Sequence, residues 1–90
     1  MIRHISISVK GKVQGVFFRA STKTKADELG ITGFVRNQSD KSVHIEAEGN
    51  NTQLTEFIAW CKQGPRLAHV ESCDVEEGIV KGFSEFLIQR

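Results

Sequence analysis

Residues 5–30 read ISISVKGKVQGVFFRASTKTKADELG, and this stretch decides the fold. Its first residues alternate isoleucine or valine with serine, which predicts a strand that buries one face. From Phe18 onward, helical spacing links positions 22, 26 and 29, and Gly30 is typical of a helix end. The intervening loop, residues 11–16, contains two glycines. The stretch therefore predicts a strand, a loop and a helix that begins where the loop ends.

Two further strands follow this helix, over residues 31–37 and 43–49. In the second of them, valine, isoleucine and alanine alternate with polar residues. Only the short polar segment 39–41 separates the two strands. We therefore expect them to form a hairpin.

A second amphipathic helix precedes the pair Gly64-Pro65. Its apolar stripe has the spacing i, i+3, i+4 and i+7 and consists of Leu54, Phe57, Ile58 and Cys61. We expect Asn51 or Thr52 to cap the start of this helix, and the glycine-proline pair to end it. Trp60 lies off the stripe and is expected to be partly exposed.

The last two strands are predicted over residues 68–75 and 83–88. In the first of these the apolar alternation changes between Val70 and Cys73, which fits either a β-bulge or a frayed edge. The element order is β-α-β-β-α-β plus a short C-terminal strand. It predicts an α+β, ferredoxin-like split β-α-β sandwich, with an antiparallel sheet and two helices on one face. Because this fold serves many functions, the function must be read from the site.

Size and composition predict a single domain over residues 1–90, with 39% hydrophobic and 26% charged residues. The longest apolar run covers residues 57–61, whereas a membrane-spanning helix needs about 20 apolar residues. The N-terminal residues alternate and do not resemble the apolar core of a signal peptide. We therefore expect a soluble, cytoplasmic, monomeric protein that does not bind a membrane.

Charge is distributed unevenly although the net charge is only +1. Residues 1–45 carry eight basic and three acidic residues, while residues 46–90 carry four basic and eight acidic residues. This asymmetry favours a small anionic ligand near the N-terminal half. The acidic second half argues against a nucleic-acid groove across the surface.

Several side chains are predicted to be structural only. Cys61 and Cys73 lack the spacing of a zinc or redox motif and are expected to be reduced core thiols. The histidines are too dispersed to form a metal site, and we expect all three on the surface: His4, His44 and His69. The aromatic residues expected in the core are Phe17, Phe18 and Phe34.

The loop before the first helix has the chemistry of an anion site. Glycines allow main-chain N–H groups to converge, and the first turn of a helix offers more unpaired N–H groups at the positive end of its dipole. Arg19 lies in that first turn. A cation there opposes the helix dipole unless an anion is bound, and a guanidinium can grip two phosphate oxygens.

At this loop the sequence resembles the acylphosphatase family. The family signature G-x-V-Q-G-V-x-F-R is matched by GKVQGVFFR over residues 11–19. A second signature combines glycine, aromatic, small apolar, basic and asparagine residues and then a strand ending in glycine. It is matched by Gly33, Phe34, Val35, Arg36, Asn37, Val43 and Gly49. The segments around Gly64-Pro65 and Phe86-x-Ile88 are also similar, so the resemblance covers nearly the whole chain.

The resemblance implies hydrolysis of acyl phosphates to a carboxylate and inorganic phosphate, with no metal or organic cofactor. Asn37 would place the attacking water, and Arg19 would bind the phosphoryl group. Main-chain amides of the loop would bind it as well, so the implied phosphate-binding residues are Gln14, Gly15, Val16, Phe17, Phe18 and Arg19. Phosphate would then act as a product inhibitor. If no other group activates the water, a phosphate oxygen of the substrate must accept its proton.

The hairpin turn departs from the family pattern, because Lys41 follows Asp40 where glycine is usual. A residue with a side chain at positive φ costs about 1 kcal/mol, so the turn is expected to be strained or of another type.

Two alternatives from other classes remain. One is an RNA-recognition-like module, since Lys81-Gly82-Phe83 begins like the RNP1 motif, although Ser84-Glu85 then departs from it. The other is a non-catalytic regulatory domain of the same fold. Two further enzyme classes are excluded by spacing: Gly11-Lys12-Val13 lacks the serine or threonine of a P-loop, and no C-x₅-R motif is present.

Overall fold

The computed structural model describes residues 1–90 and contains five strands and two helices. In chain order they are β1 (Arg3–Lys12), α1 (Phe18–Leu29), β2 (Thr32–Asn37), β3 (Val43–Gly49), α2 (Asn51–Gln63), β4 (His69–Gly78) and β5 (Phe86–Ile88). This is the order predicted from the sequence.

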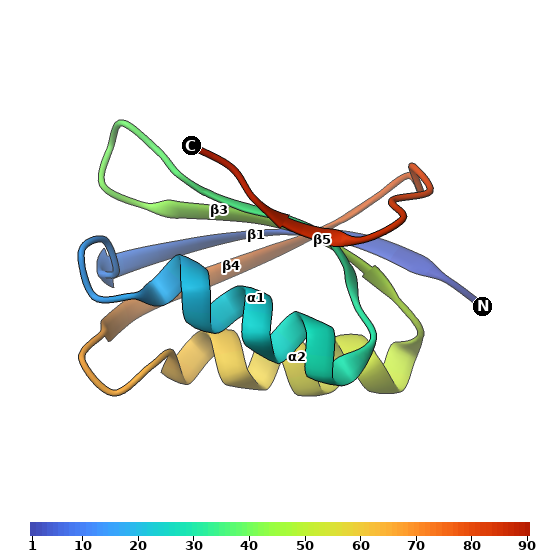
Figure 1. Ribbon diagram of the computed structural model, residues 1–90, viewed down its shortest axis with the longest axis horizontal. Coiled ribbons are helices and arrows are strands. Elements are labelled where there is room, and N and C mark those ends of the chain that lie inside the picture. Colours follow the sequence, from blue (N-terminus) through green and yellow to red (C-terminus); the bar gives the residue numbers. More distant parts are fainter.

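The strands form one sheet in the order β4-β1-β3-β2-β5, and both helices cover the same face of it (Figure 1). The first four strands in this order pair antiparallel, whereas the short β5 pairs parallel to β2. The predicted α+β, ferredoxin-like sandwich is therefore confirmed. The parallel pairing of β5 makes the five-stranded sheet a mixed one.

The core lies between the sheet and the two helices. The alternating residues of β1 bury Ile5, Ile7 and Val9 against the helices, as their period of two predicts. Helix α1 contributes Phe18 and α2 contributes its apolar stripe. The core thus forms from the faces that the two periodicities predicted.

Three local features of the strands and helices differ from the boundaries predicted from the sequence or decide between a β-bulge and a frayed edge. Strand β4 extends to Gly78, and its pairing with β1 skips Glu71, so the change of alternation is a bulge and not a frayed edge. Strand β5 begins only at Phe86. The predicted cap of α2, Asn51 or Thr52, is wrong: the cap is Asn50, whose side chain accepts a hydrogen bond from the N–H of Gln53 in a capping box.

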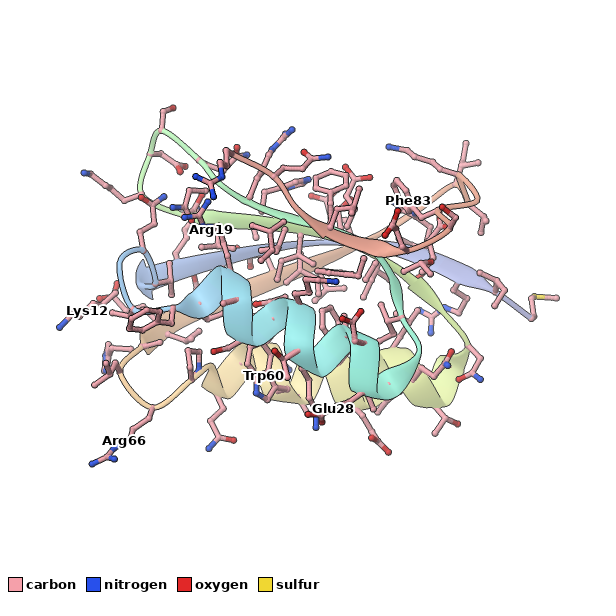
Figure 2. The ribbon with its side chains drawn as sticks, viewed as in Figure 1. Lys12, Arg19, Glu28, Trp60, Arg66 and Phe83 are labelled. Carbon is pink, nitrogen blue, oxygen red and sulfur yellow. The ribbon has the colours of Figure 1, made fainter.

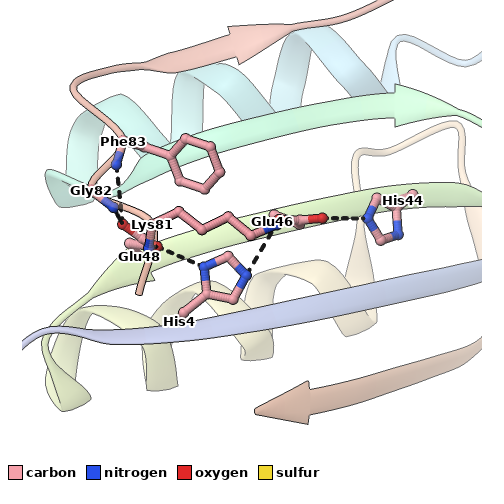
Figure 3. Close-up of polar contacts among 7 residues, drawn as sticks. All are labelled: His4, His44, Glu46, Glu48, Lys81, Gly82 and Phe83. Carbon is pink, nitrogen blue, oxygen red and sulfur yellow. Dashed lines mark hydrogen bonds and ion pairs between the residues drawn. The ribbon is translucent and has the colours of Figure 1, made fainter. Parts of the chain in front are cut away.

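The prediction that His4 lies on the surface is wrong. Its side chain is buried on the sheet face opposite the helices, where its ring lies between two carboxylates of β3 (Figure 3). Nδ1 is 2.7 Å from Oε2 of Glu48, and Nε2 is 3.3 Å from Oε1 of Glu46. His44 is half-buried and also contacts Glu46, while His69 is exposed as expected. Phe83, in the connection from β4 to β5 over residues 79–85, packs its ring beside His4 on this face.

Glu48 holds that connection in place. Its carboxylate accepts hydrogen bonds from the main-chain N–H groups of Lys81, Gly82 and Phe83 (Figure 3). Burial alone would raise the pKa of Glu48, but these N–H donors and His4 together lower the pKa below its ordinary value. The segment that resembles the start of an RNP1 motif is therefore used to anchor β5 to the rest of the fold.

Candidate active site

The loop between β1 and α1 forms a cradle of unpaired main-chain donors. None of the 10 main-chain hydrogen bonds outside helices and strands is donated by a residue from Gln14 to Ala20. Gly15 has φ 74°, and Phe17 has φ 63° at the N-cap of α1, so the chain turns sharply before the helix. The free N–H groups of the loop and of the first helical turn adjoin one another. This arrangement suits an anion with several oxygen atoms.

Gln14 ties the loop to the β2–β3 hairpin. Its side-chain Nε2 donates hydrogen bonds to the carbonyl oxygens of Gln38 and Ser42, each at 2.9 Å. Both N–H donors of the side-chain amide are therefore used within the protein, and the main-chain N–H is the donor of Gln14 that remains for an anion. The contact holds the loop against the end of β2.

Arg19 lies in the first turn of α1, on the side that faces the C-terminal segment (Figure 2). Its Nη1 donates a long hydrogen bond of 3.4 Å to the carbonyl oxygen of Gln89. The guanidinium lines a hollow of about 380 Å³ together with Gly15, Phe18 and Ile88. This hollow, here called the cradle hollow, thus combines the cation, the glycine of the loop and the C-terminal strand.

Asn37 ends β2, and β2 pairs in parallel with β5. The N–H of Gln89 donates to the carbonyl oxygen of Val35 at 2.8 Å, so the residue that contacts Arg19 also contacts β2. The side-chain Oδ1 of Asn37 is buried and has no hydrogen-bond partner. A buried acceptor without a partner is costly, and a water molecule placed there would satisfy it.

The remaining predicted phosphate-binding residues divide into two kinds. Val16 and Phe18 are buried, so their side chains anchor the loop in the core and only their main-chain groups can reach a ligand. Phe17 was expected in the core, and this is wrong, because 75% of the residue is exposed. Its left-handed backbone turns the ring away from the core. Phe34, also expected in the core, is half-buried on the opposite face of the sheet and packs edge-on against Phe83.

The sequence did not reveal the part played by β5. Ile88 lines the cradle hollow, Gln89 meets Arg19, and Lys23 of α1 donates to the carbonyl oxygen of Phe86 at 2.9 Å. These contacts join residues more than sixty positions apart in the chain. No local signal could have indicated them, since main-chain carbonyl groups are common to every residue.

No group of three or more His, Cys, Asp or Glu side chains is arranged to hold a metal ion. No helix is long and apolar enough to cross a membrane. Cys61 is buried, Cys73 is half-buried, and both thiols are free.

Comparison with known proteins gives a consistent result. The family model described as Acylphosphatase matches residues 5–88. An acylphosphatase of Methylococcus capsulatus is 46% identical over 90 residues, which cover 99% of this chain and 98% of that protein.

Two solved structures are similar over their full lengths. An acylphosphatase from Coxiella burnetii has a TM-score of 0.95 at 39% identity, with 98% of this chain and 93% of that chain covered. The crystal structure of acylphosphatase from Bacillus subtilis has a TM-score of 0.95 at 34% identity, with both chains covered completely. The family model matches nearly the whole chain, and the glycine-containing cradle at the N-terminus of α1 agrees with this match. This chain therefore belongs to the acylphosphatase family.

Proposed function

We propose that this acylphosphatase binds the phosphoryl group of its substrate on the loop amides and Arg19, and that Asn37 positions the attacking water. The activity, hydrolysis of the carboxyl-phosphate bond to a carboxylate and inorganic phosphate, follows from family membership and the relatives named above. The observation that supports these residue roles is the side-chain Oδ1 of Asn37, which is buried and has no hydrogen-bond partner. Asn37 ends β2, the strand that is hydrogen-bonded to Gln89, and Arg19 contacts Gln89.

Charge neutralisation supports the role proposed for the loop. The phosphoryl group carries negative charge on its outer oxygens, and in-line displacement spreads that charge further. Donors that are already oriented stabilise it without reorganisation. The main-chain N–H groups of residues 14–20 donate none of the hydrogen bonds found in loops and turns, and Arg19 makes one long hydrogen bond. These donors are therefore free for the substrate.

Asn37 is uncharged and cannot act as a strong base. Its amide can orient a water molecule, and a carboxylate is a good leaving group, so positioning supplies a large part of the acceleration. A phosphate oxygen of the substrate accepts the proton of the water in this scheme. No histidine lines the cradle hollow, which agrees with a step that uses no enzymic base.

The broader expectations belong to the same proposal. Residues 1–90 make up one domain that acts as a monomer in the cytoplasm on a small acyl phosphate, without binding nucleic acid or a membrane. Inorganic phosphate inhibits the reaction as a product. The RNA-binding alternative is disfavoured because Lys81, Gly82 and Phe83 are engaged by Glu48.

Hydrolysis of benzoyl phosphate by the purified protein in the presence of a chelator tests the proposal. Arg19→Gln should raise KM and lower kcat together, with kcat reduced by roughly 10² or more, while Asn37→Ala should chiefly lower kcat. Arg3→Gln and Asn51→Ala are matched controls, since they remove the same groups at the other end of the molecule. Near-normal hydrolysis by Arg19→Gln or Asn37→Ala would exclude the assigned role.

The pH profile tests the source of the proton acceptor separately. If a substrate oxygen accepts the proton, kcat should show no step that belongs to an enzymic group near neutral pH. A step that disappears when one histidine is replaced would instead identify an enzymic base. The profile should be measured for the wild type and for single replacements of each histidine by asparagine.

A further inference from the structure

Phe17 combines two unfavourable features at one position. It adopts the left-handed conformation, with φ 63° and ψ 24°, in which glycine or asparagine is less strained. It also exposes 75% of a large aromatic residue to solvent. Any residue at this position would supply the same main-chain N–H to the cradle, so the cradle does not require an aromatic side chain here. Strain and exposure at the edge of an active site therefore point to a use for the ring.

The ring stands between two hollows. On one side lies the cradle hollow, with Arg19 and Ile88. On the other side lies a hollow of about 340 Å³, here called the Leu67 hollow, which Phe17 shares with Pro65 and Leu67 of the connection between α2 and β4. Leu67 is itself 61% exposed. Two exposed apolar side chains thus face one small-molecule-sized hollow beside the cradle.

The in-line geometry of phosphoryl transfer selects one of these hollows. The attacking water and the leaving oxygen lie on opposite sides of phosphorus. Asn37 is at the β2–β3 hairpin, to which Gln14 ties one side of the loop. The α2–β4 connection lies on the other side of the loop, so that the loop runs between hairpin and connection (Figure 1). With the attacking water at Asn37 and phosphorus in the cradle, the leaving carboxylate would face the connection and the Leu67 hollow.

We propose that Phe17 and Leu67 form an acyl-group subsite that favours acyl phosphates with aromatic or large apolar acyl groups. The inference rests on the proposed function, because it takes the phosphate in the cradle and the water at Asn37. The acyl carbon is joined to phosphorus through a single oxygen, so the acyl group emerges next to the residue whose N–H borders the cradle. An aromatic acyl group gains contact with the ring of Phe17 and the side chain of Leu67.

The test compares kcat/KM for benzoyl phosphate with kcat/KM for acetyl phosphate in each variant, so that the intrinsic reactivity of the two substrates cancels. Phe17→Asn removes the ring and keeps a residue that tolerates the left-handed conformation, and Leu67→Ala removes the second wall. Each should lower the benzoyl-to-acetyl ratio by roughly three- to tenfold, as expected for the loss of one aromatic or apolar contact. The change should come from a higher KM for benzoyl phosphate.

Two further variants locate the subsite. Ile79→Ala removes an apolar side chain that is 87% exposed in the connection between β4 and β5, and it should leave the ratio unchanged. Ile88→Ala removes a wall of the cradle hollow. If the ratio falls for Ile88→Ala and not for Leu67→Ala, the acyl group lies in the cradle hollow and not in the Leu67 hollow. This result would overturn the proposal.

The outcomes also separate this inference from the proposed function. If the wild type hydrolyses both substrates and neither Phe17→Asn nor Leu67→Ala changes the ratio, the acyl subsite is refuted while the catalytic assignment stands. If the wild type hydrolyses neither substrate, the proposed function fails and the subsite fails with it.

Discussion

The imidazole Nδ1 of His4 lies 2.7 Å from Oε2 of Glu48, with both side chains buried on the sheet face opposite the helices. This contact links β1 to β3, and the same carboxylate binds the main chain of the connection that leads to β5. Since Ile88 of β5 lines the cradle hollow and the next residue, Gln89, contacts Arg19, the pair supports the active site from a distance.

Replacement of this carboxylate should weaken the fold. Glu48→Gln removes the nearer of the two carboxylates that contact His4 and weakens three main-chain hydrogen bonds, so the free energy of unfolding at neutral pH should fall by about 2 kcal/mol or more. Urea denaturation measures this change. Glu77→Gln is the control, because it breaks an exposed ion pair with Arg3 and should cost much less than Glu48→Gln.

The same carboxylate predicts how stability depends on acid. The pKa of Glu48 is lowered in the folded protein, so its contribution is fully present above its ordinary value of 4.5 and is lost as the pH falls through the lowered pKa. His4 and the main-chain N–H groups of the β4–β5 connection contact this carboxylate, whereas the ammonium group of Lys81 pairs with Glu46, which also contacts His4. Stability measured from pH 7 down to acid should decline less steeply in Glu48→Gln. An equal slope in both proteins would show that other carboxylates dominate.

Gly33 should not tolerate a side chain. A Cβ at this residue would overlap the main-chain carbonyl oxygen of Glu46 on the paired strand, and φ is 144°. Gly33→Ala should therefore reduce the free energy of unfolding by about 3 kcal/mol or more. Gly82→Ala separates clash from strain, because φ is 78° there but no atom lies within 4 Å of the added Cβ. It should cost only about 1 kcal/mol. Similar losses for both variants would contradict the steric explanation.

Lys41 carries the strain expected from the hairpin sequence. Its φ is 78°, and its N–H closes the turn to the carbonyl oxygen of Gln38 at 3.2 Å. Lys41→Gly should stabilise the protein by about 1 kcal/mol, which raises the unfolding midpoint by about 4–8 °C in a chain of this length. Lys41→Ala keeps the strain and should give little or no gain. A lower midpoint for Lys41→Gly would mean that the lysine side chain stabilises the turn.

Inorganic phosphate should both inhibit the enzyme and stabilise its fold. Competitive inhibition of benzoyl phosphate hydrolysis gives Kd, and phosphate at 100 times Kd should add about 2.7 kcal/mol to the free energy of unfolding. Thermal unfolding with phosphate or with chloride at equal ionic strength separates binding from a general salt effect. Arg19→Gln should lose the phosphate-specific shift, whereas Asn37→Ala should keep it. A shift retained in Arg19→Gln would place the phosphate elsewhere.

Local sequence patterns determined the backbone of this protein: β1, the loop that leads into α1, the hairpin with its strained Lys41, and the amphipathic stripe of α2. These features depend on periodicity and on the placement of glycines within a few residues. The anion-binding chemistry of GKVQGVFFR could be predicted for the same reason. Tertiary structure alone decided that His4 is buried, that Phe17 is exposed, that β5 pairs in parallel with β2, and that Gln89 after β5 meets Arg19. The burial of His4 and the contact of Gln89 with Arg19 depend on segments at least 44 residues apart, and the burial of a side chain is set by what packs against it, which its neighbours in sequence do not specify.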